Sequence, residues 1–155
     1  MFPRFRLARF ASKTMLARAR WALLAVLALS SAGCSRFTRT KQCRKLIAQV
    51  NPALDEVQTL TQGKSGSAQY VAAAARYERL AKDLGPMEFS SEQMAKYVAE
   101  YAGVLSACAQ NLRALAAALD SNNNAEAERA NRELERLNIR ERSAISRIDA
   151  WCQPE

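Results

Sequence analysis

Apolar residues recur along most of the chain at the three- and four-residue spacing of amphipathic helices. Four such stretches cover residues 38–61, 67–84, a segment from a cap at Ser90 to Leu119, and 125–151, and short polar turns separate them. Glycine is scarce, and Val, Ile and Thr form no alternating run that would indicate strands. The pattern predicts an all-α protein folded as an antiparallel, up-down-up-down four-helix bundle.

The apolar stripes also predict which residues form the core. The stripe positions are Cys43, Ile47, Val50, Leu54, Val57 and Thr61; Tyr70, Ala74, Tyr77, Ala81 and Leu84; Met94, Val98, Tyr101, Leu105, Cys108, Leu112, Leu115 and Leu119; and Ala127, Ala130, Leu134, Leu137, Ile145, Ile148 and Cys152. The first stripe keeps its phase across Pro52, which favours a kinked helix over a new helix start. Glu141 falls on the last stripe; we expect it at the bundle edge, and a polar core position is the alternative.

The first 33 residues follow a different pattern. Residues 1–20 contain six basic residues and no acid, and nine apolar residues, Trp21 to Leu29, come next. A basic start, a short apolar run and small residues at its end are typical of a secretory signal. The run is too short for a membrane span, which needs about 18 or more apolar residues. Met1 and Met15 are both candidate starts, because either leaves this signal intact.

The signal ends in Ser31-Ala-Gly-Cys34, which resembles the lipobox of bacterial lipoproteins, although Ser31 stands where that family favours Leu. The resemblance implies cleavage before Cys34 and a diacylglycerol anchor on its sulfur. The chain then divides into a signal peptide (1–33), a lipidated tether (34–37) and a helical bundle domain (38–155). Ser35 follows the cysteine instead of the Asp that retains many such proteins in the inner membrane, so the resemblance implies the periplasmic face of the outer membrane.

The charge of the chain is concentrated in the predicted signal. The formal net charge of +8 falls to +2 in residues 34–155, which hold 17 basic and 15 acidic residues. Nucleic-acid binding therefore loses its main support. No acid precedes Asp55, and we expect the cations beside the anchor, Arg36, Arg39 and Lys41, to contact anionic headgroups. A solvated tether and first helical turn is the alternative.

Three cysteines remain besides Cys34. Cys43 lies near the start of the first predicted helix and Cys152 at the end of the last, and in an up-down bundle these ends share one pole. In an oxidising envelope we therefore expect a disulfide between them. Cys108 lies in the middle of its stripe, and we expect it to be a small, buried, unreactive residue.

The residues of common active sites are mostly missing. The chain has no histidine, which excludes Ser-His and Cys-His nucleophile systems and His-ligated metals or haem. The cysteines are too far apart for a zinc ribbon, and no Gly-rich phosphate loop occurs. We therefore expect no cofactor, no metal and no catalysis.

Tyrosines offer the one candidate surface in the predicted bundle. Tyr70 and Tyr77 lie on the second helix, and Tyr97 and Tyr101 on the third. Together they could line a ligand pocket or a partner surface, or they are core-edge residues with wet hydroxyls. The favoured function is a lipid-anchored envelope protein with a structural or protein-interaction role and an envelope protein as its partner. The alternative is a bundle that binds a small ligand or lipid in the periplasm.

Overall fold

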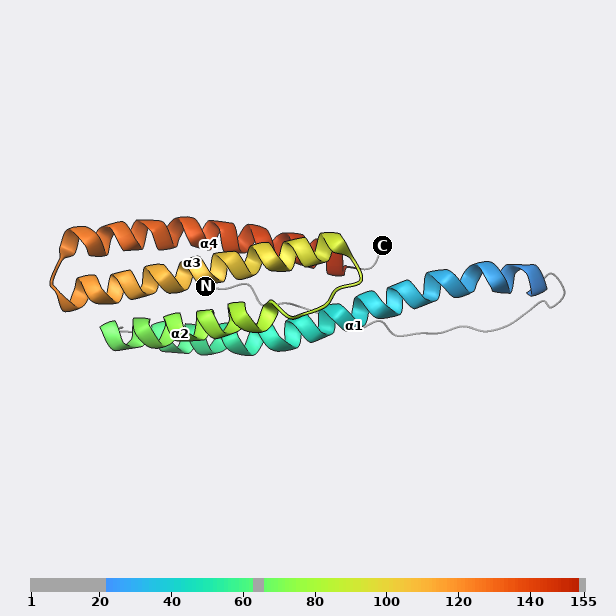
Figure 1. Cartoon of the computed structure of the whole chain (residues 1–155), viewed down its shortest axis with the longest axis horizontal. Coiled ribbons are helices and arrows are strands. Elements are labelled where there is room, and N and C mark those ends of the chain that lie inside the picture. Colours follow the sequence, from blue (N-terminus) through green and yellow to red (C-terminus); the bar gives the residue numbers. More distant parts are fainter. Residues whose placement is uncertain (1–21, 63–65, 154–155) are drawn as a thin grey trace.

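The protein is a bundle of four helices. A computed structural model describes the backbone of residues 22–62 and 66–153, and side chains from residue 37 onward within these ranges. The helices are α1 (Ala22–Thr61), α2 (Ser67–Leu84), α3 (Glu92–Asp120) and α4 (Asn124–Cys152), and the described residues contain no strand. Successive helices run antiparallel and pack side by side, which confirms the predicted all-α bundle (Figure 1). The pair α1–α2 forms one layer and the pair α3–α4 the other.

The first helix is longer than its apolar stripe predicted. It begins at Ala22 instead of residue 38, so the predicted tether 34–37 is helical, and its N-terminal part projects beyond the bundle (Figure 1). Pro52 lies inside α1, and no new helix starts there. A single helix through Pro52 is what the unbroken phase of the apolar stripe favoured. The side chain of Cys34 and the start of the predicted signal lie outside the described residues.

Two helix starts are fixed by polar caps. The Met94 N–H donates to Ser91 Oγ over 3.3 Å, so the cap of α3 is Ser91 and the predicted cap at Ser90 is wrong by one residue. Ser90 Oγ instead donates to Gln42 Oε1 on α1 over 3.1 Å. Asn123 caps α4 by accepting from the Glu126 N–H at 3.2 Å. The connections before α3 and α4 therefore each contain a side chain that caps the start of the following helix.

The core follows the predicted stripes closely, with a few exchanges at the edges. Leu46 is buried where Ile47 was expected, and Leu119 is 40% exposed. The side chain of Glu141 is in the core, with the residue only 2% exposed, so its expected place at the bundle edge is wrong and the alternative, a polar core position, is right. Glu141 lies four residues from both Leu137 and Ile145, and this spacing holds all three on the inward face of α4.

Ion pairs join neighbouring helices on the outside of the bundle. Arg76 on α2 lies 2.6 Å from Glu56 on α1. Arg113 on α3 donates two hydrogen bonds to Glu78 on α2, at 2.9 and 2.7 Å, and Arg147 on α4 donates to Glu100 on α3 at 2.7 Å. Because both partners of each pair are at least partly exposed to solvent, we expect each pair to add little to stability.

Candidate functional site

The pole of the bundle nearest to the predicted anchor is held by a disulfide. Cys43 of α1 and Cys152 of α4 are bonded, with their Cα atoms 5.9 Å apart. The predicted pairing is confirmed. The bond joins helices that are first and last in sequence, 109 residues apart. It lies nine positions after Cys34, so the start and end of the bundle domain are fixed together immediately above that position.

Arg39 reinforces the same pole. Its Nε donates to the Trp151 carbonyl oxygen at 2.5 Å, and a terminal nitrogen donates to the Gln153 carbonyl oxygen at 3.2 Å. Its guanidinium also lies over the Trp151 ring, 4.8 Å from the ring centroid. Carbonyl groups at a helix C-terminus lack partners within the helix, and a cation there also favours the helix dipole. We call Arg39, Cys43, Trp151 and Cys152 the clasp.

The clasp gives one of the predicted headgroup cations partners within the protein. Arg39 was expected to face anionic lipid together with Arg36 and Lys41, but its side chain is half-buried and bonded to the end of α4. Lys41 is exposed, and the side chain of Arg36 lies outside the described ones. The sequence spacing could have predicted this position of Arg39, because Arg39 precedes Cys43 by four residues and so lies on the helix face that carries the disulfide.

The four tyrosines separate into an inner and an outer pair. Tyr77 is 5% exposed and Tyr101 is 1% exposed, so both are core residues. Tyr70 and Tyr97 are half-buried at the edge of the core. The guanidinium of Arg147 lies over the Tyr97 ring, 5.6 Å from its centroid. Tyr77 and Tyr101 therefore contribute almost no accessible surface, and Tyr70 and Tyr97 lie at the edge of the core.

A small polar cluster occupies the middle of the otherwise apolar interior. Glu141 Oε1 and the Tyr101 hydroxyl are both buried and have no hydrogen-bond partner among the described residues. Burial raises the pKa of Glu141 to about 7, against weaker opposing effects of the nearby Tyr101 hydroxyl and Arg142. Burial, and then the Glu141 charge, raise the pKa values of Tyr77 and Tyr101.

Cys108 belongs to this cluster and is a free, buried thiol, 5% exposed. Burial, and then the charge of Glu141, raise the pKa of its thiol to about 12. Thiolate is the reactive form of cysteine, so this thiol has little nucleophilic character near neutral pH. The burial expected from its stripe position is confirmed.

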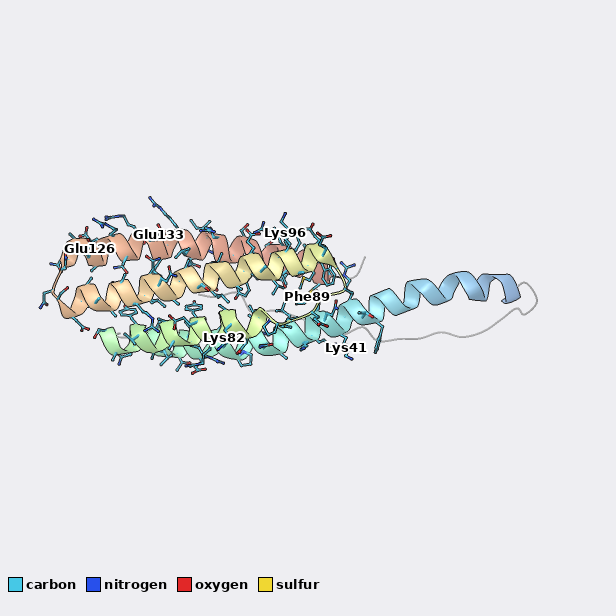
Figure 2. The ribbon with its side chains drawn as sticks, in the orientation of Figure 1. Lys41, Lys82, Phe89, Lys96, Glu126 and Glu133 are labelled. Atoms are coloured by element: carbon cyan, nitrogen blue, oxygen red, sulfur yellow. A yellow bond between two sulfur atoms is a disulfide. The ribbon has the colours of Figure 1, made fainter. Side chains whose placement is uncertain are left out.

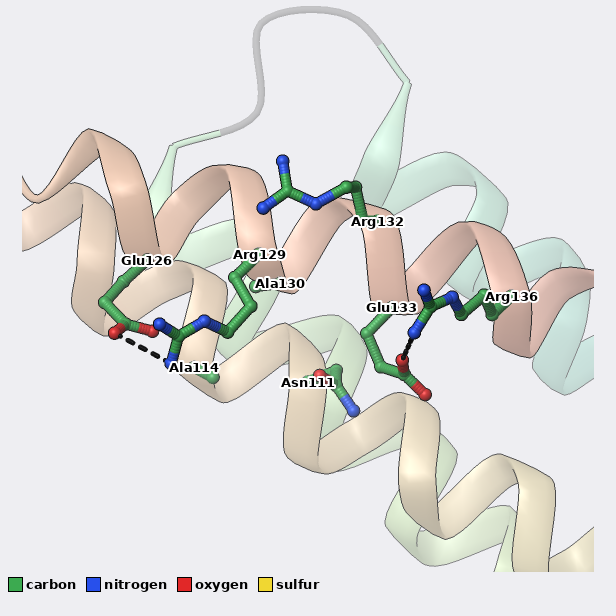
Figure 3. Close-up of a pocket in the computed structure, with 8 residues that line it drawn as sticks. All are labelled: Asn111, Ala114, Glu126, Arg129, Ala130, Arg132, Glu133 and Arg136. Atoms are coloured by element: carbon green, nitrogen blue, oxygen red, sulfur yellow. Dashed lines mark hydrogen bonds and ion pairs between the residues drawn. The ribbon is translucent and has the colours of Figure 1, made fainter.

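A charged cleft lies between α3 and α4 at the opposite pole (Figure 3). It encloses about 330 Å³ and is lined by Asn111, Ala114, Glu126, Arg129, Ala130, Arg132, Glu133 and Arg136. Figure 3 shows two of its arginines paired with acids of the same helix: Arg129 with Glu126 at 3.1 Å, and Arg136 with Glu133 at 3.4 Å. None of the four tyrosines lines it. The cleft is lined by charged side chains, by their apolar stems and by two alanines, and it is open to solvent.

Residues 22–62 and 66–153 contain no group of three or more His, Cys, Asp or Glu side chains that could hold a metal ion. By length and composition alone, α3 is the one helix in this part that could cross a membrane, although its apolar stripe is packed in the bundle core.

Two structural features were only partly predicted from the sequence. One is the clasp, of which the sequence predicted the disulfide but not the contribution of Arg39. The other is the buried cluster around Glu141, whose place on an apolar stripe was the available signal. No protein-family model, curated protein or solved structure significantly matches this chain.

Proposed function

We propose that the protein is a bacterial envelope lipoprotein, anchored through lipid on Cys34, whose bundle has a structural or protein-interaction role and no catalytic one. The observation that supports this most is the connection between the predicted anchor position and the bundle. α1 continues as one helix from the position of Cys34 into the bundle, and the disulfide closes the bundle nine residues later. A disulfide fits an oxidising compartment such as the periplasm. A helical connection with a closed pole holds the domain in a defined place at the membrane.

The outer face of α4 is the surface we propose for a protein partner. Ile139 is 63% exposed there, among the charged side chains of Glu135, Arg136 and Arg142. An exposed apolar residue surrounded by arginines and acids resembles the centre and rim of a protein interface, where a few anchors dominate binding.

The alternative function, binding of a small ligand, has one observation in its favour. The cleft between α3 and α4 has the volume of a small-ligand site, but its lining is charged. A ligand held there would be polar and would interact with the guanidinium groups of Arg129 and Arg136. The tyrosines would not take part.

Lipid attachment is tested by metabolic labelling with a radioactive or alkyne-tagged fatty acid. We expect label in the full-length protein and none in Cys34→Ala, because the thioether would be the point of attachment. Cys108→Ala is the matched control and should label fully, since this thiol is buried and free. Label in Cys34→Ala equal to that in the unsubstituted protein would refute the anchor.

The interaction role is tested by photo-crosslinking in intact cells. A photoreactive amino acid at position 139 should give a discrete protein adduct, because Ile139 is the exposed apolar residue on the proposed face. The same amino acid at Ala72, which is exposed on α2, is the control and should give none. If position 139 gave no adduct although the photoreactive protein was present in the membrane fraction and was irradiated, a partner on this face would be refuted.

A further inference from the structure

One face of α1 carries exposed cations and an exposed aromatic ring. Phe37, Lys41, Arg44, Lys45 and Ala48 are all exposed, and Phe37 is 73% exposed. Their separations of three, four, seven, eight and eleven residues place them on one side of the helix. The buried residues Leu46 and Val50 lie on the opposite side. We call Phe37, Lys41, Arg44 and Lys45 the basic stripe.

The cations of the basic stripe differ from those of α4 in forming no ion pair with a described residue. Lys41, Arg44 and Lys45 make no ion pair or hydrogen bond with any described residue, and α1 contains no acid before Asp55. Arginines of α4 instead alternate with glutamates and pair with them, as Arg132 does with Glu128 at 3.5 Å. The basic stripe therefore presents an uncompensated positive charge, and Figure 2 shows Lys41 on the α1–α2 layer, away from α3 and α4.

The register of α1 places the predicted anchor position on the same side. Residue 34 precedes Phe37 by three residues, Lys41 by seven and Ala48 by fourteen, which are all separations along one helix face. The helix is unbroken between these positions. A lipid at residue 34 and the basic stripe would thus meet a membrane together if the helix lay along it. If the helix stood upright, the stripe would rise away from the surface.

We infer that the basic stripe rests on an anionic lipid surface, so that α1 lies along the membrane and the α3–α4 layer faces away from it. Lysine and arginine side chains near a bilayer are attracted by anionic headgroups, and an exposed phenylalanine adds apolar insertion at the interface. This inference rests on the proposed anchor at Cys34. The cations that we infer to contact headgroups are Lys41, Arg44 and Lys45. Arg39 is left out because it binds the end of α4.

The orientation is tested with the full-length lipidated protein in vesicles. A fluorophore is attached through Ala48→Cys on the stripe side, or through Ser146→Cys on α4, in a Cys108→Ala background. Both positions are exposed, and they lie at similar heights above the clasp on opposite layers. Position 48 is about 21 Å along the helix from position 34, at 1.5 Å per residue. Vesicles of phosphatidylcholine with or without phosphatidylglycerol carry a nitroxide quencher on a fraction of their headgroups.

In vesicles with phosphatidylglycerol we expect the label at position 48 to be quenched several-fold more than the label at position 146. Neutralising the stripe in Lys41→Gln/Arg44→Gln/Lys45→Gln should remove this difference, and high salt should reduce it. The charge-matched control Lys96→Gln/Arg132→Gln/Arg140→Gln, on the other layer, should retain it. Equal quenching at the two positions, or a difference that survives neutralisation of the stripe, would overturn the inference.

The same experiment separates this inference from the anchor on which it rests. Mass spectrometry of the purified protein reports whether Cys34 carries lipid before the vesicles are made. A lipidated protein with equal quenching refutes the orientation and leaves the anchor intact. A protein adduct on the stripe, obtained with a photoreactive residue at position 48 in cells, would instead assign this face to a protein partner and refute the lipid contact.

Discussion

Replacing Cys43 and Cys152 together by alanine should lower the free energy of unfolding by about 4 kcal/mol. The bond closes a loop of 109 residues. In the chain-entropy model, a crosslink of that span restricts the unfolded chain by an amount worth roughly 4–5 kcal/mol. A domain of this size has a total stability of only about 5–15 kcal/mol, so the loss is a large part of it. The double variant should therefore unfold at a much lower urea concentration than the unsubstituted protein.

Reduction provides the internal control for this prediction. The unsubstituted protein in reducing agent should unfold like Cys43→Ala/Cys152→Ala, and the double variant should not respond to reductant. Cys108→Ala should respond to reductant as fully as the unsubstituted protein does, because its thiol is unpaired. A urea midpoint of the unsubstituted protein that does not change on complete reduction would contradict a stabilising role for the bond.

The bundle could be predicted because local and tertiary preferences agree in most of the chain. In α3, residues from Met94 to Leu115 recur at one helical phase, and all the stripe positions among them are buried. The start and end of α2 were predicted to the residue, because a glycine-containing turn precedes it and Gly85-Pro86 follows it. The pairing of Cys43 with Cys152 followed from topology and from the oxidising compartment that the signal implied, since an even number of antiparallel helices returns the chain to its starting pole.

The features that escaped prediction depend on groups that meet only in the folded protein. The start of α1 was expected at residue 38, close to the start of its amphipathic stripe, but the helix begins at Ala22, and Ser30, Ser31 and Gly33 before residue 38 give no local reason for this extension. The hydrogen bonds of Arg39 to the end of α4 were not predicted, because the carbonyl groups that accept them lie 112 and 114 residues away in the sequence. Of the contacts in the clasp, the sequence thus predicted only the disulfide between Cys43 and Cys152.

Glu141 shows the limit of a pattern most clearly. Its position on the stripe was evident, but a charged residue there is more often at an edge, since burying an ionised carboxylate is costly. The structure places it inside, where the interior favours the neutral acid and raises the pKa to about 7 from an ordinary value of 4.5. The unfolded chain releases this proton near pH 4.5, whereas the folded protein retains it until about pH 7.

The stability of the fold should therefore fall as the pH rises through this interval. The contribution of the neutral carboxyl is fully present below pH 4.5 and is lost as the pH rises through 7. A pKa difference of about 2.5 corresponds to roughly 3 kcal/mol, at 1.36 kcal/mol per pKa unit. The titratable neighbours Tyr77, Tyr101 and Cys108 keep their protons throughout, because burial raises their pKa values.

Glu141→Gln should abolish most of this pH dependence. Glutamine keeps the shape of the side chain and cannot ionise, so the variant should match the unsubstituted protein near pH 4 and exceed its stability by up to about 3 kcal/mol at pH 8.5. Urea unfolding at intervals of half a pH unit measures the difference. The exposed Glu135→Gln on the same helix is the control and should follow the unsubstituted protein at every pH. If the Glu141→Gln and unsubstituted curves ran parallel, the carboxyl would already be ionised in the fold, and a water or backbone shift would have to solvate it.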